Sequence, residues 1–209
     1  KQRILEAAMK EFAERGYDGA SLNTVCAENG ISKGIIYHHF KDKDELYLLC
    51  AAECFTAAAH FLQAEITALN TPAPGTGSFY STEQKLQLYF DARLRFFAEN
   101  PLYQGIFSDT VFNPPAKLET QLSECRKQFD DVNISFLEGL LKNETLRKNI
   151  SASDAAGDFR AYMDFFNMHF KISAKDKESR EQTFFEHEKL CHRQIDILLY
   201  GVLGGNHEK

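Results

Sequence analysis

Tryptophan is absent from this chain of 209 residues, and proline is scarce, with five residues. Long apolar runs are also missing, since no stretch approaches the roughly 20 uninterrupted apolar residues of a membrane span. The nearest candidate, residues 46–62, is interrupted by Glu53, Thr56 and His60. Residues 1–15 are amphipathic and rich in charge, unlike a secretory signal. These absences predict a soluble, cytoplasmic protein with no membrane partner.

Paired cysteines are lacking too, because the five cysteines are odd in number, widely spread and free of any CxxC pair. Reduced, mostly buried thiols are therefore expected. Cys50 with Cys54, and His187 with Cys191, share helix faces, so a metal or redox sensor is an alternative, although two ligands do not close a site. We predict no metal and no cofactor.

Catalytic motifs are missing as well: the chain has no nucleophile elbow, phosphate loop or metalloprotease motif. An enzyme built from dispersed residues, such as the neighbours Cys191 and His192, stays an alternative, but adjacency in sequence does not establish catalytic geometry. The chain is predicted not to be an enzyme.

An excess of positive charge is the last absence, since the formal net charge is −6. Residues 1–45 hold 7 Lys and Arg against 8 Asp and Glu, so this segment is close to neutral while the rest is acidic. Bulk charge does not identify a nucleic-acid binder here, and any basic patch must be local. Hydrophobic residues make up 44% of the chain, enough for a buried core.

What the chain does contain is helical periodicity, because apolar residues recur three and four positions apart in almost every segment. The first helix is predicted to end at Gly16, and a long helix that begins after Asp42 to run to residue 69. Asn100-Pro101 and Asn113-Pro114 are each predicted to cap a helix that starts at the proline. The pattern predicts an all-α fold of about nine helices.

Residues 21–40 read SLNTVCAENGISKGIIYHHF. They form two helices too short to bury much surface alone, joined by a tight turn at Gly30 and braced by residues 1–15, which is typical of a helix-turn-helix. Ser21 and Ser32 can cap these helices and present free N–H groups to phosphates. A major groove accepts one α-helix, whose donors suit phosphates and base edges. The second helix leaves these residues on or near its exposed face: Lys33, Gly34, Ile35, Tyr37, His38 and His39.

The span RILEAAMKEFAERGYDGASLNTVCAENGISKGIIYHHFKDKDELY resembles the N-terminal DNA-binding domain of the TetR family of transcriptional regulators. The specific parts are the GY-x-x-A-S entry to the second helix, the SKG-x-x-YHHF recognition helix and the K-x-K-x-EL run. One departure is Ile35, at a position that can hold a polar base-reading residue, so only apolar contact is available there. The resemblance implies that the following residues lie at or near DNA: Ser21, Lys33, Gly34, Tyr37, His38, His39 and Lys43.

The resemblance implies a function and a domain plan. Residues 1–45 would form the helix-turn-helix DNA-binding domain, and residues 46–209 a helical effector-binding and dimerisation domain. The chain would be a ligand-responsive transcriptional regulator, in the first place a repressor, that binds a palindromic operator in double-stranded DNA as a homodimer. The alternative is an interaction module or small-molecule carrier that kept the fold without operator binding, which the near-neutral N-terminal segment favours.

Aromatic residues are concentrated in the second domain and suggest a pocket for a small apolar or aromatic effector, as the resemblance also implies. For any single aromatic residue, ordinary core packing is the more common role. The candidates for the pocket are Phe90, Phe97, Tyr103, Phe107, Phe129, Phe136, Tyr162 and Phe166.

The last helix carries more apolar surface than a single peripheral helix needs, and residues 155–170 carry a second apolar stripe. Pairing both helices with their twofold mates would make a four-helix dimer interface, as the resemblance also implies. The candidates for this interface are Phe159, Phe184, Cys191, Ile195, Leu198 and Val202.

Overall fold

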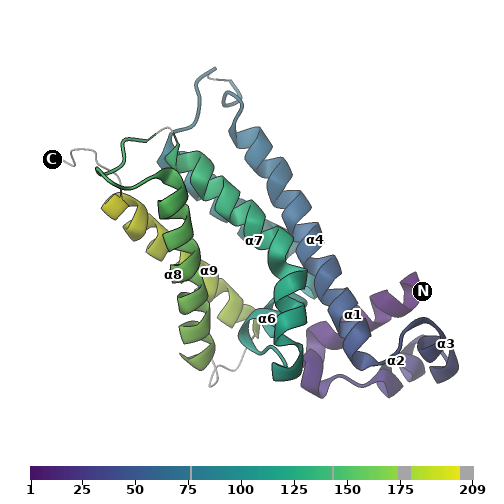
Figure 1. Cartoon of the computed structure of the whole chain (residues 1–209). Coiled ribbons are helices and arrows are strands. Elements are labelled where there is room, and N and C mark those ends of the chain that lie inside the picture. The colour runs from purple at the N-terminus through teal and green to yellow at the C-terminus, as the bar shows by residue number, and fades with distance from the viewer. Residues whose placement is uncertain (76, 143, 174–179, 203–209) are drawn as a thin grey trace.

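The computed structural model describes residues 1–75, 77–142, 144–173 and 180–202, and its elements there are nine α-helices and one short 3-10 helix (Figure 1). The all-α prediction is confirmed. Figure 1 shows α1–α3 gathered at one end of the molecule, and α4 and α7 running side by side away from them. The elements are α1 (Gln2–Gly19), α2 (Leu22–Asn29), α3 (Lys33–His39), α4 (Lys43–Leu69), α5 (Thr82–Glu99), α6 (Pro101–Phe112), η1 (Ala116–Leu118), α7 (Glu119–Leu141), α8 (Ala152–Ser173) and α9 (Arg180–Val202).

Two serine caps define the short helices α2 and α3. The Ser21 side chain accepts a hydrogen bond from the Asn23 N–H at 3.2 Å, and the Ser32 side chain accepts one from the Ile35 N–H at 3.3 Å. Between the helices Gly30 adopts φ 61° and ψ 34°, a left-handed conformation that glycine tolerates without steric cost. Both predicted caps and the glycine turn are therefore confirmed.

The first helix departs from the prediction at Gly16. Helix α1 does not stop there but is interrupted, because Gly16 takes φ 68° and ψ 177°, and one further turn follows up to Gly19. The break frees the Tyr17 N–H from the helical hydrogen-bond ladder, and this N–H donates instead to the side chain of Asp109 in α6 at 2.7 Å. The glycine thus tilts the chain without leaving a buried donor unpaired.

Helix α4 begins at a charged cap and continues through residue 46, where we predicted the domain boundary. The Asp42 carboxylate accepts from the Glu45 N–H at 2.9 Å, and the Glu45 carboxylate accepts from the Lys41 N–H at 2.5 Å. Further along, α4 packs on α1 as well as on α7. The N-terminal helices and the rest of the chain therefore share one continuous helix.

By length and composition α4 is also apolar enough to cross a membrane, and it is the one such helix among the described residues. Half of its most apolar stretch is buried against other helices of this chain. A core helix of a soluble protein passes the same test, so its hydrophobicity follows from its contacts with α1, α5, α6 and α7.

The connections around α6 follow the prediction at one end only. Pro101 is the first residue of α6, as predicted, but the Asn100 side chain donates backwards to the Phe96 carbonyl at 2.8 Å. At the other end Asn113 closes α6 instead of opening a helix, so the Asn113-Pro114 prediction is wrong. A second proline, Pro115, follows and precedes the single turn η1. Two consecutive prolines favour extended backbone at this point, which delays the next helix.

Candidate functional site

The outward face of α3 is the first candidate site. Ile36 and Phe40 are 1% and 2% exposed and attach α3 to the core, whereas Ile35 and Tyr37 are 51% and 55% exposed. Both of these exposed side chains are therefore open to contact with a partner. The predicted residues Ser32, Lys33, Gly34, His38 and His39 are exposed as well, and Ser21 is half-buried at the start of α2.

Two of the lysines near α3 lie against aromatic rings. The ammonium of Lys43, at the first turn of α4, lies 4.5 Å from the centre of the Tyr17 ring, and that of Lys1 lies 5.7 Å from the centre of the Phe40 ring. Such cation–π contacts hold the side chains close to the protein surface. Lys33 and Lys41 remain fully exposed. The face therefore presents a tyrosine, two histidines and a few local cations rather than a broad basic surface.

A second candidate site is a cavity of about 80 Å³ enclosed by α5, α6, α7, α8 and α9. Phe90, Phe107 and Phe129 line it, so three of the predicted pocket residues come together there. Apolar side chains of Val111, Ile134, Leu137, Met163, Cys191 and Ile195 complete much of its wall.

The other five predicted aromatic residues do not line this cavity. Phe97 and Phe136 are buried behind it: the Phe97 ring centre lies 4.8 Å from that of Phe107, and Phe136 stacks on Tyr89 at 4.0 Å. Tyr103 stacks on Phe96, outside the cavity wall. Core packing explains these positions.

The remaining two lie on α8. The Tyr162 hydroxyl donates to the Gln194 side chain at 2.8 Å, and the Phe166 ring centre lies 5.1 Å from the His187 ring. Both contacts join α8 to α9, and neither side chain is part of the cavity lining.

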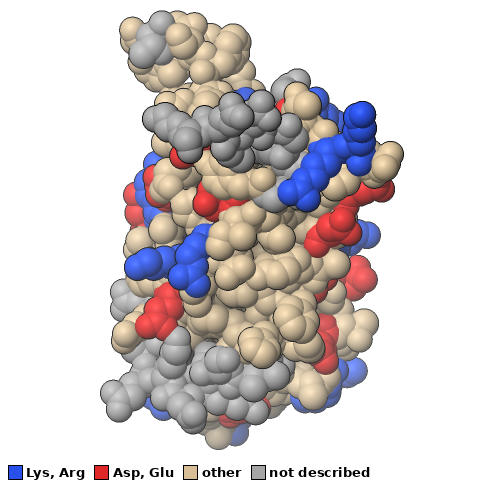
Figure 2. Space-filling view, turned by 90° about the vertical axis from the view of Figure 1, so that its left-hand side faces the viewer, with Lys and Arg blue, Asp and Glu red and all other residues tan. Residues whose placement is uncertain are grey.

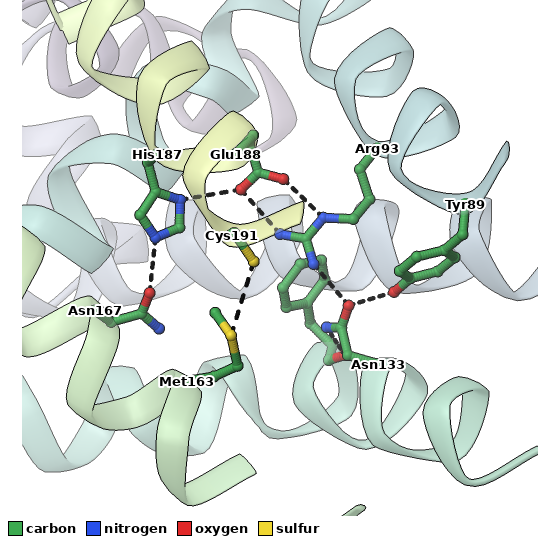
Figure 3. A network of polar contacts seen from close by, with 9 residues as sticks. Tyr89, Arg93, Asn133, Met163, Asn167, His187, Glu188 and Cys191 are labelled. Atoms are coloured by element: carbon green, nitrogen blue, oxygen red, sulfur yellow. Dashed lines mark hydrogen bonds and ion pairs between the residues drawn. The ribbon is translucent and has the colours of Figure 1, made fainter. Parts of the chain in front are cut away.

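Arg93, at the wall of the cavity, belongs to a buried ion pair (Figure 3). Arg93 in α5 donates from Nε and Nη2 to the two carboxylate oxygens of Glu188 in α9, at 2.9 and 3.0 Å. Its Nη1 donates to Asn133 Oδ1 in α7 at 2.8 Å, and the Tyr89 hydroxyl donates to the same oxygen. Three helices are thus linked through one guanidinium, which is the geometry of a bidentate charge-assisted pair.

The charges of this pair stabilise each other. Burial by itself raises the pKa of the Glu188 carboxyl, but the nearby charge of Arg93 has the opposite effect and brings the pKa down to about 2. The pKa of the Cys191 thiol, which points into the same space, is raised by burial to about 12. Glu188 is therefore ionised at neutral pH, whereas Cys191 is a neutral, unreactive thiol.

His187 connects the pair to α8. Its Nδ1 lies 3.2 Å from Glu188 Oε1, and its Nε2 lies 2.7 Å from Asn167 Oδ1 (Figure 3). Rings of Phe112 and Phe170 lie 4.9 and 5.0 Å from the imidazole centre. A chain of polar contacts therefore links Arg93 through Glu188 and His187 to Asn167 in α8.

A larger cavity of about 330 Å³ adjoins the inner one. Both are lined by the same four residues of α6, α7 and α8, which are Val111, Arg126, Asp164 and Asn167. Arg126 donates to Asp130 at 2.9 Å and lies 3.7 Å from Asp164, so an ion-pair cluster borders the shared wall. This larger cavity has a mainly polar lining, which includes Thr110, Ser123 and Asn167.

Helix α6 separates this cavity from the N-terminal helices. Phe107 and Val111 face the cavity, whereas Asp109 accepts hydrogen bonds from the Tyr17 N–H and the Tyr47 hydroxyl, both at 2.7 Å. Gly105 lies so close to α1 that a Cβ atom there would be 2.7 Å from the Ala13 carbonyl oxygen. One helix is therefore in contact both with the cavity and with α1, which in turn packs against α2.

Comparison with known proteins adds a sequence match to this geometry. Residues 4–50 match the family model described as bacterial regulatory proteins, tetR family. The N-terminal domain belongs to the TetR family. Over 53 residues, 25% of this chain and 28% of the relative, the chain is 47% identical to the HTH-type transcriptional repressor AcnR of Corynebacterium efficiens.

A second relative also matches over a short stretch only. The biofilm operon negative transcriptional regulator IcaR of Staphylococcus epidermidis is 34% identical over 62 residues, 30% of this chain and 34% of IcaR. The matched part of the chain thus spans about a third or less of either regulator. The sequence identity to these two regulators is therefore limited to a short part of the chain. The function of the remaining helices has to be argued from their own structure.

The whole chain has the fold of solved TetR-family structures. The transcriptional regulator FadR of Bacillus subtilis, solved in complex with stearoyl-CoA, covers 96% of this chain with a TM-score of 0.64, and 98% of that structure is covered in turn. At 14% identity this likeness shows the fold alone. The helices that follow the TetR-type domain are therefore arranged as in a solved structure, whereas most of their side chains differ from those of that structure.

Four of the six predicted interface residues lie in the core of the chain. Phe159, Phe184, Cys191 and Ile195 are between 0% and 5% exposed, and the last two line the inner cavity, so they offer no surface to a partner. Leu198 is half-buried, and the side chain of Val202 lies outside the described residues. The stripe that we chose on α9 faces inward because α5, α6 and α8 pack against it.

The cysteines provide no grouped metal ligands. Cys50 and Cys54 are buried in α4, and burial raises the pKa of the Cys50 thiol to about 12. Cys54 Sγ lies 3.3 Å from the Tyr103 carbonyl, and Cys191 Sγ lies 3.8 Å from Met163 Sδ. Within the part of the chain that the structure describes, no three His, Cys, Asp or Glu side chains are grouped as a metal site would need.

Arg93 and Glu188 are the residues that our sequence reasoning missed. Both lie in the apolar stripes we recognised: Arg93 follows Tyr89 by four positions, and Glu188 follows Phe184 by four. A charged residue at a buried position of a helical stripe is a signal for a buried ion pair. The sequence could have indicated that each was buried, but it does not say which residue of which helix is its partner.

Proposed function

We propose that this protein is a ligand-responsive transcriptional regulator that binds a palindromic DNA site as a homodimer. The observation that carries the proposal is the outward face of α3, where Tyr37 and Ile35 are open to solvent on a helix that Ile36 and Phe40 fix to the core. A helix presented in this way fits a major groove. The printed names of AcnR and IcaR, a repressor and a negative regulator, favour repression.

In this proposal Lys33, His38, His39 and the N-termini of α2 and α3 contact phosphates, and Tyr37 contacts the phosphates or base edges. Ile35 offers apolar contact to a thymine methyl group. Because the domain is close to neutral, we expect weak, strongly salt-dependent binding to non-specific DNA. Such a role is regulatory rather than catalytic, and it places the protein in the bacterial cytoplasm.

Selection of bound duplexes from a random-sequence DNA pool tests this proposal. The expected result is an enriched palindromic site, and Tyr37→Ala should weaken binding to it by about 1–3 kcal/mol. Phe79→Ala is the matched control: its ring is 66% exposed, in the loop between α4 and α5 at the end of α4 opposite the DNA-binding helices (Figure 1). Failure to enrich any sequence would favour the alternative, a small-molecule carrier or interaction module, which the near-neutral charge of residues 1–45 supports.

Ligand response, in this proposal, passes through α6. A molecule in the cavity would press on Phe107 and Val111, and the same helix holds α1 through Gly105 and Asp109. Closely packed helices shift as rigid bodies, so a small movement of α6 would reorient the TetR-type domain. The effector would be a small apolar or aromatic compound, in keeping with the residues of the cavity wall.

The dimer, in this proposal, uses the outer face of α8 and α9. Phe165, Met168, Ile197 and Tyr200 are 57%, 56%, 57% and 37% exposed there. Figure 2 shows the side of the molecule where these two helices lie, with an uncharged centre and charged residues toward its edges. An apolar centre inside a charged rim is typical of protein–protein interfaces.

Light scattering tests the dimer with a matched pair of variants. Ile197→Glu should give a monomer, because a charge at the centre of the interface would be buried without a partner. Leu88→Glu, on an α5 side chain that is 37% exposed, should leave the dimer intact. A dimeric Ile197→Glu protein would place the interface elsewhere.

A further inference from the structure

Arg93 has one hydrogen-bond donor left over beside the cavity. A guanidinium carries five N–H groups, and three of those of Arg93 donate to Glu188 and Asn133. The Tyr89 hydroxyl is a further hydrogen-bond partner of the guanidinium, so one N–H is left outside these contacts, although Arg93 is only 7% exposed. A buried donor without a partner is unfavourable, so an oxygen atom placed in the cavity would be stabilised by accepting a hydrogen bond from it.

The charge of Arg93 is already balanced. Glu188, 1% exposed, holds both of its oxygens toward the guanidinium, so the pair carries no net charge. A carboxylate ligand would bring a further negative charge into this enclosed space, and a cation would meet the guanidinium directly. An uncharged oxygen acceptor avoids both costs.

The shape of the cavity limits what can carry that oxygen. Its volume of about 80 Å³ is about the space of two or three water molecules in the liquid. The centres of the Phe90 and Phe129 rings lie 5.7 and 5.3 Å from the guanidinium carbon, so apolar surface surrounds the donors. A group the size of an acetyl fits there, and the rest of the molecule extends past Val111 and Asn167 into the outer cavity.

From these observations we infer that the effector of this protein is a small, uncharged carbonyl compound with an apolar or aromatic body. Its carbonyl oxygen accepts a hydrogen bond from the remaining N–H of Arg93, and its body packs against Phe129 and Val111. The inference rests on the proposed function, because it names the class of ligand to which that regulator responds.

Three benzene derivatives of similar size test the inference by isothermal titration calorimetry on the full chain without DNA. Acetophenone carries the uncharged carbonyl, ethylbenzene lacks an acceptor, and benzoate carries a charge. A hydrogen bond to a charged donor predicts that acetophenone binds about 10- to 100-fold more tightly than ethylbenzene. Benzoate should bind more weakly than acetophenone. Equal binding of acetophenone and ethylbenzene, tightest binding of benzoate, or no binding of any of the three would overturn the inference.

A double variant separates the role of Arg93 from that of the cavity walls. Replacement of a buried ion pair by apolar residues of similar volume is often tolerated, so Arg93→Met with Glu188→Met should keep the helical fold, as circular dichroism can check. The preference for acetophenone over ethylbenzene should then fall below about threefold, because the guanidinium donor is gone. A preference that stays near its original size would show that Arg93 does not receive the carbonyl.

A second measurement uses the unaltered chain and does not depend on the variant. The guanidinium N–H signals of Arg93 should shift in NMR spectra on addition of acetophenone and stay in place with ethylbenzene; unchanged signals at saturating acetophenone would contradict the proposed contact. The DNA selection is independent of these tests. Carbonyl binding without operator binding would overturn the regulator proposal alone, and operator binding without the ligand preference would overturn this inference alone.

Discussion

The two ends of the molecule place their polar side chains in opposite ways. In the TetR-type domain, the short helix α3 turns its polar residues and Tyr37 outward and keeps only Ile36 inside. In the larger helical part, α5 and α9 turn Arg93 and Glu188 inward, where they are hydrogen-bonded to each other beside the cavity. The first arrangement depends on one helix and its caps, and the second on helices 95 positions apart in the chain. Surface recognition is therefore a local property here, and the interior site is a property of packing.

The largest expected effect comes from breaking the interior pair. Glu188→Gln leaves the buried guanidinium without its counter-charge and should lower the free energy of unfolding by about 3–5 kcal/mol. Urea unfolding monitored by circular dichroism measures this change. The double replacement of Arg93 and Glu188 by Met should recover most of the loss. If Glu188→Gln cost less than about 1 kcal/mol, the pair would contribute far less than its burial indicates.

A smaller loss is expected where the two ends touch. Gly105→Ala would place a Cβ 2.7 Å from the Ala13 carbonyl oxygen and should destabilise the fold by about 1–3 kcal/mol through overpacking. Gly139→Ala in α7 is the matched control, because nothing lies within 4 Å of its Cβ position, and it should stabilise the helix by about 0.5–1 kcal/mol. Thermal unfolding of the two variants should therefore shift in opposite directions, and equal shifts would argue against close contact between α1 and α6.

On the DNA side, Lys33→Gln should reduce the slope of log affinity against log salt by about one, since one phosphate contact is removed. Binding titrations at several salt concentrations measure the slope. Lys142→Gln, at the C-terminal cap of α7 at the opposite end of the molecule from α3 (Figure 1), should leave it unchanged. The same slope for both variants would mean that α3 does not face the phosphates.

The smallest effect concerns the exposed contact between η1 and α4. Hydrogen bonds from Lys117, at 2.6 and 2.8 Å, and from the Tyr17 hydroxyl lower the pKa of Asp44. Because the folded pKa lies below the unfolded one, the contribution to stability is present at neutral pH and is lost as the pH falls through the folded pKa. Lys117→Met should raise the Asp44 pKa in an NMR titration. A pKa that does not move would mean that Lys117 is not the dominant partner.

Local sequence patterns are enough to place most of the helices and several of their ends. The caps at Ser21 and Ser32 and the turn at Gly30 depend on neighbours within three residues, so they can be recognised without knowing the fold. The same locality allowed the exposed face of α3 to be predicted from the sequence. Local hydrogen bonds and helical periodicity act over one or two turns, which is the range that sequence patterns cover.

Sequence patterns did not show whether an apolar stripe packs in the core, lines the cavity or stays at the surface. Phe184, Cys191 and Ile195 have the spacing of an interface stripe and of a core stripe alike, and contact with α5, α6 and α8 made them core. In the same way, packing brought Phe90, Phe107 and Phe129 to one cavity and left Phe97 and Phe136 behind it. A helix's periodicity shows that one face is buried, but the partner of that face is set by contacts distant in sequence. The meeting of Arg93 with Glu188 was decided by the same long-range packing, because neither residue's own helix contains the other half of the pair.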